Sequence, residues 1–367
     1  MEIPKDSTTP SYKQIQLEVT SRCNLRCTTC LYAYFEPQWQ AQDLSEDLFQ
    51  KVLGIAHRCE SVHLQGWGES LLRQDCPDLI KQLKNGGCQV TLSSNGTIMD
   101  SSMAQDLIQA GLDSMAFSFA GTSARMQDPL RGHGTFDAAC EAVKLFARAR
   151  PAKSSPPLVL NILLTPDTVR TLPGAVTLCA RLGADILYAG HMVQAVVPEQ
   201  EKMVARKLYE QNQWKVFLSR FSVLWHRVTL KFPSITDAPV PMCPKNPLEN
   251  LFIGSDGSVS PCVYLNPPLK GPYTSRINGK SIRMSRVIMG NLNDHSLDSI
   301  WNCESYRSFR QAFKDRILFY DAMMSGVVPD LSVMEKLERA RDHIQQRFTT
   351  SFMPPQACRH CTYLERG

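Results

Sequence analysis

The stretch VTSRCNLRCTTC, residues 19–30, contains three closely spaced cysteines, Cys23, Cys27 and Cys30, directly after a strand-like segment. Three is an unusual number of thiols, because closed zinc sites and most iron–sulfur clusters take four protein ligands, and disulfides use thiols in pairs. Three thiolates on a [4Fe-4S] cluster leave one iron without a protein ligand, and that iron can bind a small chelating molecule, as the open position of a catalytic zinc does. The pattern favours such a cluster over two alternatives, which are a zinc site with a distant fourth ligand and three core cysteines that match the pattern by chance.

The composition is that of a soluble globular protein, since 43% of the 367 residues are hydrophobic and 20% are charged, and the length suggests two domains. The net charge of +5 is mild and no dense Lys/Arg run occurs, so nucleic acid is not an expected partner. No apolar stretch is long enough to cross a bilayer, and the start, MEIPKDSTTPSYKQ, lacks the apolar centre of a signal peptide. We therefore expect a cytoplasmic protein without a membrane partner, in which grouped cysteines, among 13 in all, bind metal more often than they form disulfides.

Short apolar segments alternate with helical patterns through the first two-thirds of the chain. Strands are predicted at 15–19, 61–65, 89–93, 114–118, 158–164 and 186–190. Helices are predicted between them, near 45–57, 74–85, 101–110, 136–149 and 172–182. This order is typical of βα units on a parallel sheet, and six units are too few to close an eight-fold barrel, so a partial barrel or an open sheet is expected. Either fold gathers its active site at the carboxyl ends of the strands, where the three cysteines lie.

The character of the sequence changes near residue 236, in the proline-rich segment PSITDAPVPMCPKNP (233–247). We place a domain boundary there, which gives a larger domain of residues 1–235 and a smaller one of residues 236–367. A hairpin, LFIGSDGSVSPCVY (251–264), is predicted at the start of the smaller domain.

Four cysteines of the smaller domain have the number that a closed metal site requires. Cys243 and Cys262 flank the predicted hairpin, and Cys358 and Cys361 lie near the end of the chain as C-x2-C. Because the ends of a compact domain can return to a hairpin, their distance in sequence does not prevent a common site. A tetrathiolate zinc site and four unlinked thiols are the alternatives.

The segment CNLRCTTC resembles the cluster loop of the radical S-adenosylmethionine (SAM) superfamily, and three further segments resemble that family in the same order, each at or after a predicted strand. They are LQGWGESLL (64–72), SSNGT (93–97) and FSFAGTSARMQDPLRGHGTF (117–136). The resemblance implies a partial (β/α)6 TIM-like barrel in which SAM chelates the open iron. One electron from the reduced cluster then cleaves SAM to methionine and a 5′-deoxyadenosyl radical, which abstracts a hydrogen atom from the substrate. Two positions depart from the family, since Thr29 stands where an aromatic residue is frequent and Trp67 stands where glycine is common.

The same resemblance implies which residues contact SAM around the three cluster ligands. They are Gly66, Gly68 and Glu69 for the methionine amino group, Ser94, Asn95 and Ser118 for the ribose, and Arg131 for the methionine carboxylate. Taken locally, the glycine-rich and Asn-Gly segments are equally ordinary turns, and Arg131 has a surface or helix-capping role as its alternative.

The C-terminal region resembles the auxiliary-cluster domains of this superfamily, which are called SPASM or, in a shorter form, twitch. The resemblance lies in the hairpin, the segment GNLNDHSLDSIW (290–301) and the final cysteine pair. It implies one auxiliary [4Fe-4S] cluster held by Cys243, Cys262, Cys358 and Cys361. Cys303 is interpreted as a packing residue.

Three functions are compatible with these features. In the first, an oxidoreductase-like enzyme abstracts hydrogen from its substrate, and the auxiliary cluster takes up the second electron to complete a net oxidation or a new bond. The second is redox-neutral radical epimerisation, and the third is a non-catalytic zinc-binding scaffold. A cluster with four protein ligands cannot bind substrate without losing one of them, so the electron role is preferred.

The expected substrate is a small polar metabolite, because a single auxiliary cluster is expected and little sequence precedes the first strand for a leader-binding domain. A peptide or protein maturase, with peptide recognition by a separate protein, is the alternative. A low-potential electron donor such as flavodoxin or ferredoxin is the expected partner. His63 and His191 lie at strand ends and are candidate substrate contacts, with satisfied core or rim histidines as the alternative.

Overall fold

The structure is a computed structural model that describes residues 12–151, 155–204, 228–231, 239–325 and 333–364. Its main element is a ten-stranded sheet in the order β12-β9-β8-β1-β2-β3-β4-β5-β6-β7. The parallel strands are β1 (Tyr12–Leu17), β2 (Cys59–Leu64), β3 (Gln89–Ser94), β4 (Ser114–Phe119), β5 (Leu158–Leu164), β6 (Ile186–His191), β7 (Thr229–Lys231) and β8 (Asn250–Ile253). The first six overlap the six predicted strands, and the α/β partial barrel is confirmed.

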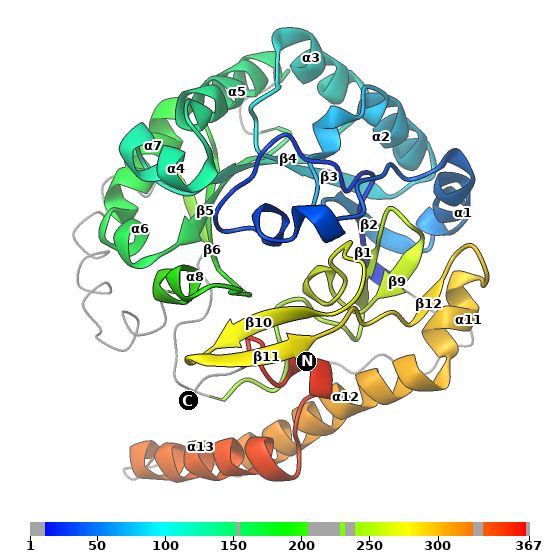
Figure 1. Cartoon of the computed structure of the whole chain (residues 1–367), viewed down its shortest axis with the longest axis vertical. Coiled ribbons are helices and arrows are strands. Elements are labelled where there is room, and N and C mark those ends of the chain that lie inside the picture. The colour runs from blue at the N-terminus through cyan, green and yellow to red at the C-terminus, as the bar shows by residue number, and fades with distance from the viewer. Residues whose placement is uncertain (1–11, 152–154, 205–227, 232–238, 326–332, 365–367) are drawn as a thin grey trace.

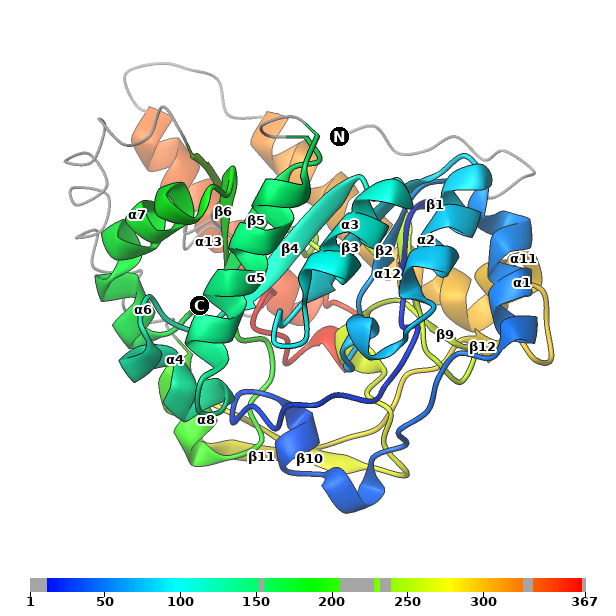
Figure 2. The same ribbon diagram turned by 90° about the horizontal axis from the view of Figure 1, so that it is seen from above.

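Helices follow these strands, and most of them cover one side of the sheet. They are α1 (Glu46–Ala56), α2 (Cys76–Asn85), α3 (Ser101–Gln109), α4 (Ala124–Arg131), α5 (Thr135–Ala149), α6 (Pro166–Arg170), α7 (Leu172–Leu182) and α8 (Pro198–Met203). Figure 1 shows α1 to α7 as an arc around the strands, and Figure 2 shows the same layer from above. Within the described ranges, no helix is both long and apolar enough to span a membrane.

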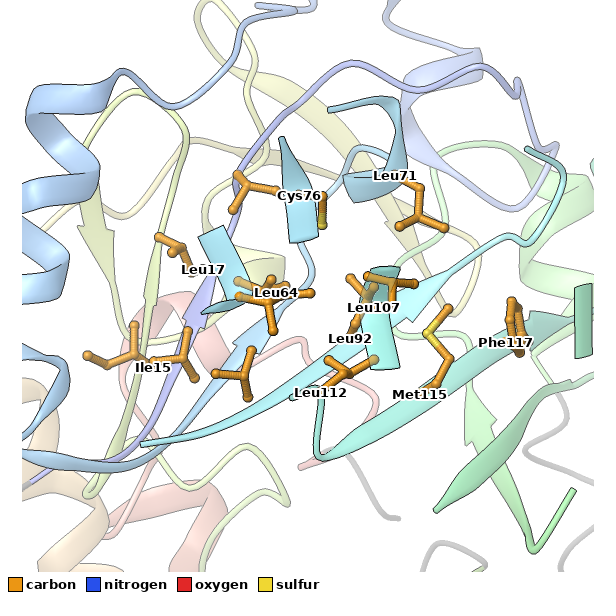
Figure 3. Close-up of a cluster of buried hydrophobic side chains, with 14 of the residues drawn as sticks. Ile15, Leu17, Leu64, Leu71, Cys76, Leu92, Leu107, Leu112, Met115 and Phe117 are labelled. Carbon is orange, nitrogen blue, oxygen red and sulfur yellow. The ribbon is translucent and has the colours of Figure 1, made fainter. Parts of the chain in front are cut away.

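The two faces of the sheet differ in chemistry, because successive side chains of a strand point to opposite faces. The face toward the helices forms an apolar core that includes Ile15, Leu17, Leu64, Leu92, Met115 and Phe117 (Figure 3). The residues that alternate with them face the inside of the partial barrel and are mostly polar, among them Gln14, Gln16, His63, Thr91, Ser93 and Ser118. The barrel interior is therefore suited to bind polar groups.

The C-terminal hairpin continues the barrel sheet, a pairing that was not predicted from the sequence. β8 pairs in parallel with β1, with Gln14 opposite Asn250 and Leu17 opposite Ile253. Beyond β8 the sheet is extended by β9 (Ser258–Ser260) and β12 (Gly290–Asn291). The predicted boundary between residues 235 and 236 lies outside the described residues, so the division into domains stays a proposal.

The remaining C-terminal elements lie on the other side of the strands from the helical arc (Figure 1). They are the antiparallel hairpin of β10 (Tyr273–Ile277) and β11 (Lys280–Met284), and the helices α11 (Leu297–Asn302), α12 (Glu304–Ser325) and α13 (Val333–Thr350). Arg58, just after α1, joins α11 to the barrel, since its Nη1 and Nη2 donate to the Asp298 carboxylate at 2.9 and 2.6 Å. The Tyr12 hydroxyl donates to the same carboxylate at 3.0 Å.

Candidate functional site

The loop of the three N-terminal cysteines follows β1 and is tied to its surroundings at several points. The Thr28 N–H donates to the Leu130 carbonyl at 2.8 Å, at the end of α4. Arg26 donates from Nη1 to the Cys23 carbonyl at 2.9 Å, and its guanidinium lies 3.8 Å from the centroid of the Tyr32 ring. These contacts tie the backbone that carries the three sulfurs to the end of α4 and brace it within the loop itself.

The three thiols are half-buried and influence one another electrostatically. Burial raises the pKa of Cys23 to about 12 and of Cys30 to about 11, and it raises the pKa of Cys27 as well. Coordination to a metal centre would deprotonate such thiols. Among the described residues, no group of three or more His, Cys, Asp or Glu side chains is close enough to hold one metal ion. A cubic cluster does not need that convergence, because each cysteine binds a different iron.

The loop after β2 packs directly on the backbone of the cysteine loop. A Cβ atom at Gly68 would lie 2.2 Å from the Thr20 carbonyl oxygen and 2.5 Å from that of Arg22, so only glycine fits at this position. The Glu69 N–H donates to the same Arg22 carbonyl at 2.8 Å. The segment predicted to hold the methionine amino group therefore lies against the segment predicted to hold the cluster.

Glu69 and Asn95 are linked beside the cysteine loop. The buried Glu69 carboxylate accepts a hydrogen bond from the Asn95 N–H at 2.7 Å, and Asn95 Nδ2 donates to Asn24 Oδ1, within the cysteine loop, at 2.9 Å. Ser94 Oγ accepts from the Gly96 N–H at 2.9 Å. Burial raises the pKa of Glu69, although hydrogen bonds to its carboxylate from the Asn95 N–H, the Ser94 side chain and the Leu71 N–H oppose the rise. The structure thus brings Glu69, Ser94 and Asn95 together next to the cysteines, and their contact with SAM stays a prediction.

Arg131 is the last residue of α4 and lies beside the cysteine loop. Its positive charge lowers the pKa of Cys27 and of Cys30, which opposes the effect of burial. Its Nε atom is buried and has no hydrogen-bond partner among the described residues. A buried donor without a partner is costly, so this geometry fits a bound anionic group such as a carboxylate. Ser118 lies on the inner face of β4, in register with Asn161 of β5, and its contact with the ribose stays a prediction.

The four C-terminal cysteines line one cavity, although two of them lie far along the chain from the other two. Cys243, Cys262, Cys358 and Cys361 share its wall with apolar residues that include Val193, Leu265, Phe309 and Phe313. Burial raises the pKa of Cys358 well above its usual value, and the charges of the other three thiols add to the rise. The structure brings the predicted ligands of the auxiliary cluster together, and the ligation itself stays a prediction. Cys303 instead packs against the main core, as predicted.

Arg316 of α12, which was not among the predicted site residues, holds the segments that lead to these cysteines. Its side chain is buried, and its Nε and Nη2 donate to the carbonyls of Pro241 and Val240 at 3.0 Å each. Its Nη1 donates to the Phe352 carbonyl at 2.5 Å, and burial lowers its pKa to about 10. One side chain therefore joins the approaches to Cys243 and to the C-terminal pair. No local motif marks this role, because it depends on three segments meeting in space.

His63 is the centre of a hydrogen-bond network in the barrel interior. Its Nδ1 lies 2.7 Å from Thr91 Oγ1, and its Nε2 lies 3.1 Å from Gln65 Oε1 and 3.2 Å from Ser93 Oγ. Gln16 Nε2 extends the network to β1 by donating to the Gln65 carbonyl at 3.1 Å. Burial lowers the pKa of His63 to about 4, so the imidazole is neutral at neutral pH.

The polar interior reaches the C-terminal cysteines. A second cavity is lined by Gln14, Gln16, Lys245 and Cys262, among other residues. Lys245 also lines the cavity of the four cysteines, and its Nζ lies 5.5 Å from the centroid of the Tyr264 ring. His191, the other candidate histidine, is the last residue of β6.

Comparison with known families matches both parts of the chain. A family model described as the radical SAM superfamily matches residues 17–179, and a SPASM model described as an iron–sulfur cluster-binding domain matches residues 243–320. The first range contains the three N-terminal cysteines, and the second contains Cys243 and Cys262. Together the two models cover more than half of the chain.

Relatives of similar length agree with these matches. The chain is 25% identical over 308 residues to the tungsten-containing aldehyde ferredoxin oxidoreductase cofactor-modifying protein of Pyrococcus furiosus, which covers 81% of this chain and 83% of the relative. It is 22% identical over 326 residues to the AdoMet-dependent heme synthase of Oleidesulfovibrio alaskensis, and this match covers 82% of this chain and 77% of the relative. Its fold resembles that of Streptococcus suis SuiB bound to the precursor peptide SuiA, with a TM-score of 0.59, 12% identity, and coverage of 81% of this chain and 66% of that chain.

The geometry and the family matches lead to one assignment. The chain is an enzyme, which removes the zinc-binding scaffold from consideration, and its cofactors are SAM, a SAM-binding [4Fe-4S] cluster and an auxiliary iron–sulfur cluster. The chain belongs to the radical SAM superfamily and carries an iron–sulfur cluster-binding domain of the SPASM type at its C-terminal end.

Proposed function

We propose that this enzyme abstracts a hydrogen atom from a small polar metabolite in the barrel interior and that the auxiliary cluster accepts the second electron, which completes a net oxidation or a new bond. The main support is the polar inner face, which runs from the His63 network to the cavity of the C-terminal cysteines. Polar groups that converge in a cavity are suited to hydrogen-bond a ligand, and a purely apolar ligand would leave them unpaired.

The N-terminal part of the site would bind SAM and its cluster. Cys23, Cys27 and Cys30 would hold three irons and leave the fourth for SAM, while the unpaired Nε of Arg131 would donate to the methionine carboxylate. When bound, the cluster and SAM supply the radical that abstracts hydrogen. An apolar cluster of Leu31, Tyr32, Trp39, Leu269 and Tyr273 packs against Cys23 and Cys30 and would exclude water from this region.

The C-terminal part of the site would handle the second electron. Four protein thiolates leave no iron open for substrate, so transfer of an electron is the role that this ligand set allows. Burial raises the pKa of Cys243 and Cys262, and the charge of Lys245 opposes that rise. The same charge would stabilise the added negative charge of a reduced cluster, which supports the electron role.

Replacing Lys245 with methionine is therefore expected to lower the midpoint potential of the auxiliary cluster. The loss of one nearby positive charge is expected to shift it by roughly 60 mV, which for one electron is a tenfold change in the equilibrium constant. A redox titration followed by electron paramagnetic resonance measures the shift. The exposed Lys270, changed to methionine, is the control, and an equal shift in both variants would contradict a local effect of Lys245.

A peptide substrate is the second candidate. SuiB, which shares the fold, binds a precursor peptide. β11 pairs with β10 on one side and, within the described residues, has no strand on the other, so its edge could pair with an extended peptide.

Radical epimerisation with a cysteine as hydrogen donor receives less support. The six cysteines that are not predicted ligands all belong to the main core or pack against it.

Separating a cell extract by size into metabolites and peptides tests the proposal. The reconstituted, reduced enzyme would be incubated with SAM and either the metabolites or the peptides of a cell extract, and formation of 5′-deoxyadenosine would be measured above the rate without substrate. We expect stimulation by the metabolite fraction. Stimulation by the peptide fraction alone would replace the first candidate by the second.

A further inference from the structure

We propose that Glu18 and Trp67 are positioning residues that clamp the SAM-binding loop, residues 66–69, onto the auxiliary-cluster hairpin, residues 250–264, so that the seating of the C-terminal region sets the affinity for SAM. This inference rests on the proposed role of residues 66–69 in holding SAM. Neither residue was among the predicted contacts of SAM. Glu18 contacts both the loop and the hairpin, and Trp67 lies in the loop and contacts the hairpin.

Glu18 is a buried carboxylate, 2% exposed, that follows β1. Its Oε1 accepts a hydrogen bond from the Trp67 N–H at 2.7 Å, and its Oε2 accepts from the Ser255 N–H at 3.2 Å and the Ser255 hydroxyl at 3.1 Å. A carboxylate removed from water needs such donors, and here they come from two segments far apart in sequence. Glu18 therefore joins the loop after β2 to the turn between β8 and β9.

Gly66 shows how closely the loop lies on this carboxylate. A Cβ atom at residue 66 would come within 2.4 Å of the Glu18 Cγ and Oε1 atoms. Because that distance is far shorter than a van der Waals contact, any side chain at residue 66 would push the loop away from Glu18. The loop therefore lies in direct contact with Glu18.

Trp67 forms the second connection. Its indole Nε1 donates to the Val263 carbonyl at 3.0 Å, and Val263 directly follows the predicted cluster ligand Cys262. Its ring meets those of Trp39 and Tyr264 edge to face, with centroids 6.1 and 6.3 Å apart. This explains the departure from the family pattern at residue 67, since a glycine there could make none of these contacts.

The two connections place the hairpin and the SAM-binding loop in one mechanical unit. The backbone N–H of Trp67 is held through Glu18, its side chain is held by Val263, and the next two residues are Gly68 and Glu69. A displacement of the hairpin would therefore move the residues predicted to hold the methionine amino group.

The test uses the holoenzyme with both clusters reconstituted, and it measures the dissociation constant of SAM together with KM and kcat for 5′-deoxyadenosine formation. In Glu18→Gln, one of the two accepting oxygens becomes an amide nitrogen, which is a donor. It would face the N–H of Trp67 or of Ser255, so one of these hydrogen bonds would be lost. In Trp67→Phe, the ring is largely kept and the indole donor is lost. Each variant is expected to raise the Kd and KM for SAM about three- to tenfold, with iron content and the kcat at saturating SAM retained.

Two matched variants control for a general loss of stability. Ser114→Ala removes a hydroxyl that donates to the Pro157 carbonyl at 3.1 Å, and Trp301→Phe alters a buried tryptophan that packs against Tyr12. Both are expected to leave the Kd of SAM unchanged.

Wild-type affinity for SAM in Glu18→Gln and Trp67→Phe would overturn the clamp, as would an equal loss in the controls. If Glu18→Gln does not fold, Trp67→Phe alone decides. A wild-type holoenzyme that does not bind SAM would instead overturn the proposed function.

Discussion

Replacing Cys23, Cys27 and Cys30 together with alanine is expected to reduce SAM cleavage below detection while the iron of the C-terminal region stays in place. The physical reason is that the SAM-binding cluster loses all its protein ligands, whereas the cavity of the four C-terminal cysteines keeps its own. Iron content per chain and the formation of 5′-deoxyadenosine, measured on anaerobically reconstituted protein, check both parts of this result.

The control for this variant is Cys140→Ala, which removes a thiol from the apolar core and should leave cleavage and iron content unchanged. Surviving cleavage in the triple variant would contradict the assignment of the N-terminal cysteines. Loss of iron from both sites in the triple variant would contradict two independent sites.

Replacing Cys358 and Cys361 with alanine is expected to have the second-largest effect. Here SAM cleavage is retained and formation of the oxidised product is lost. The variant should still cleave SAM when SAM is saturating, because its N-terminal cysteines are intact, but turnover of substrate to the oxidised product should fall below detection. The substrate would lose a hydrogen atom without an acceptor for the second electron. The measurement is the ratio of product to 5′-deoxyadenosine, with the active metabolite fraction as substrate.

Cys303→Ala is the matched control, since Cys303 belongs to the same region and packs against the main core outside the predicted ligand set. It should keep the wild-type ratio. An unchanged ratio in the variant that lacks Cys358 and Cys361 would show that the auxiliary cluster has no part in the electron balance.

The barrel was predictable because its signals are local. Each of the first six strands is a short segment with apolar residues on its core face, and the predicted 158–164 and 172–182 coincide with β5 and α7. The pairing of β8 with β1 was not predictable in the same way. It joins residues 14–17 to residues 250–253, and no property of either segment alone specifies that partner.

The same distinction between local signals and contacts of distant segments applies to the site. The cysteines were predicted as ligands from their spacing and number, and the structure places the four C-terminal thiols around one cavity. Glu18 and Arg316 were not identified, because their roles come from hydrogen bonds to segments distant in sequence. Trp67 did give a signal, as a departure from the family pattern, but its meaning required the position of Val263.

Release of 5′-deoxyadenosine by the reduced, iron-replete wild-type enzyme is the measurement that tests most directly whether the three-cysteine loop leaves one iron open for SAM. We predict that 5′-deoxyadenosine and methionine form in equal amounts and that both depend on the reductant. A sample that contains its full iron and is reduced, yet releases no 5′-deoxyadenosine from SAM, would contradict that claim.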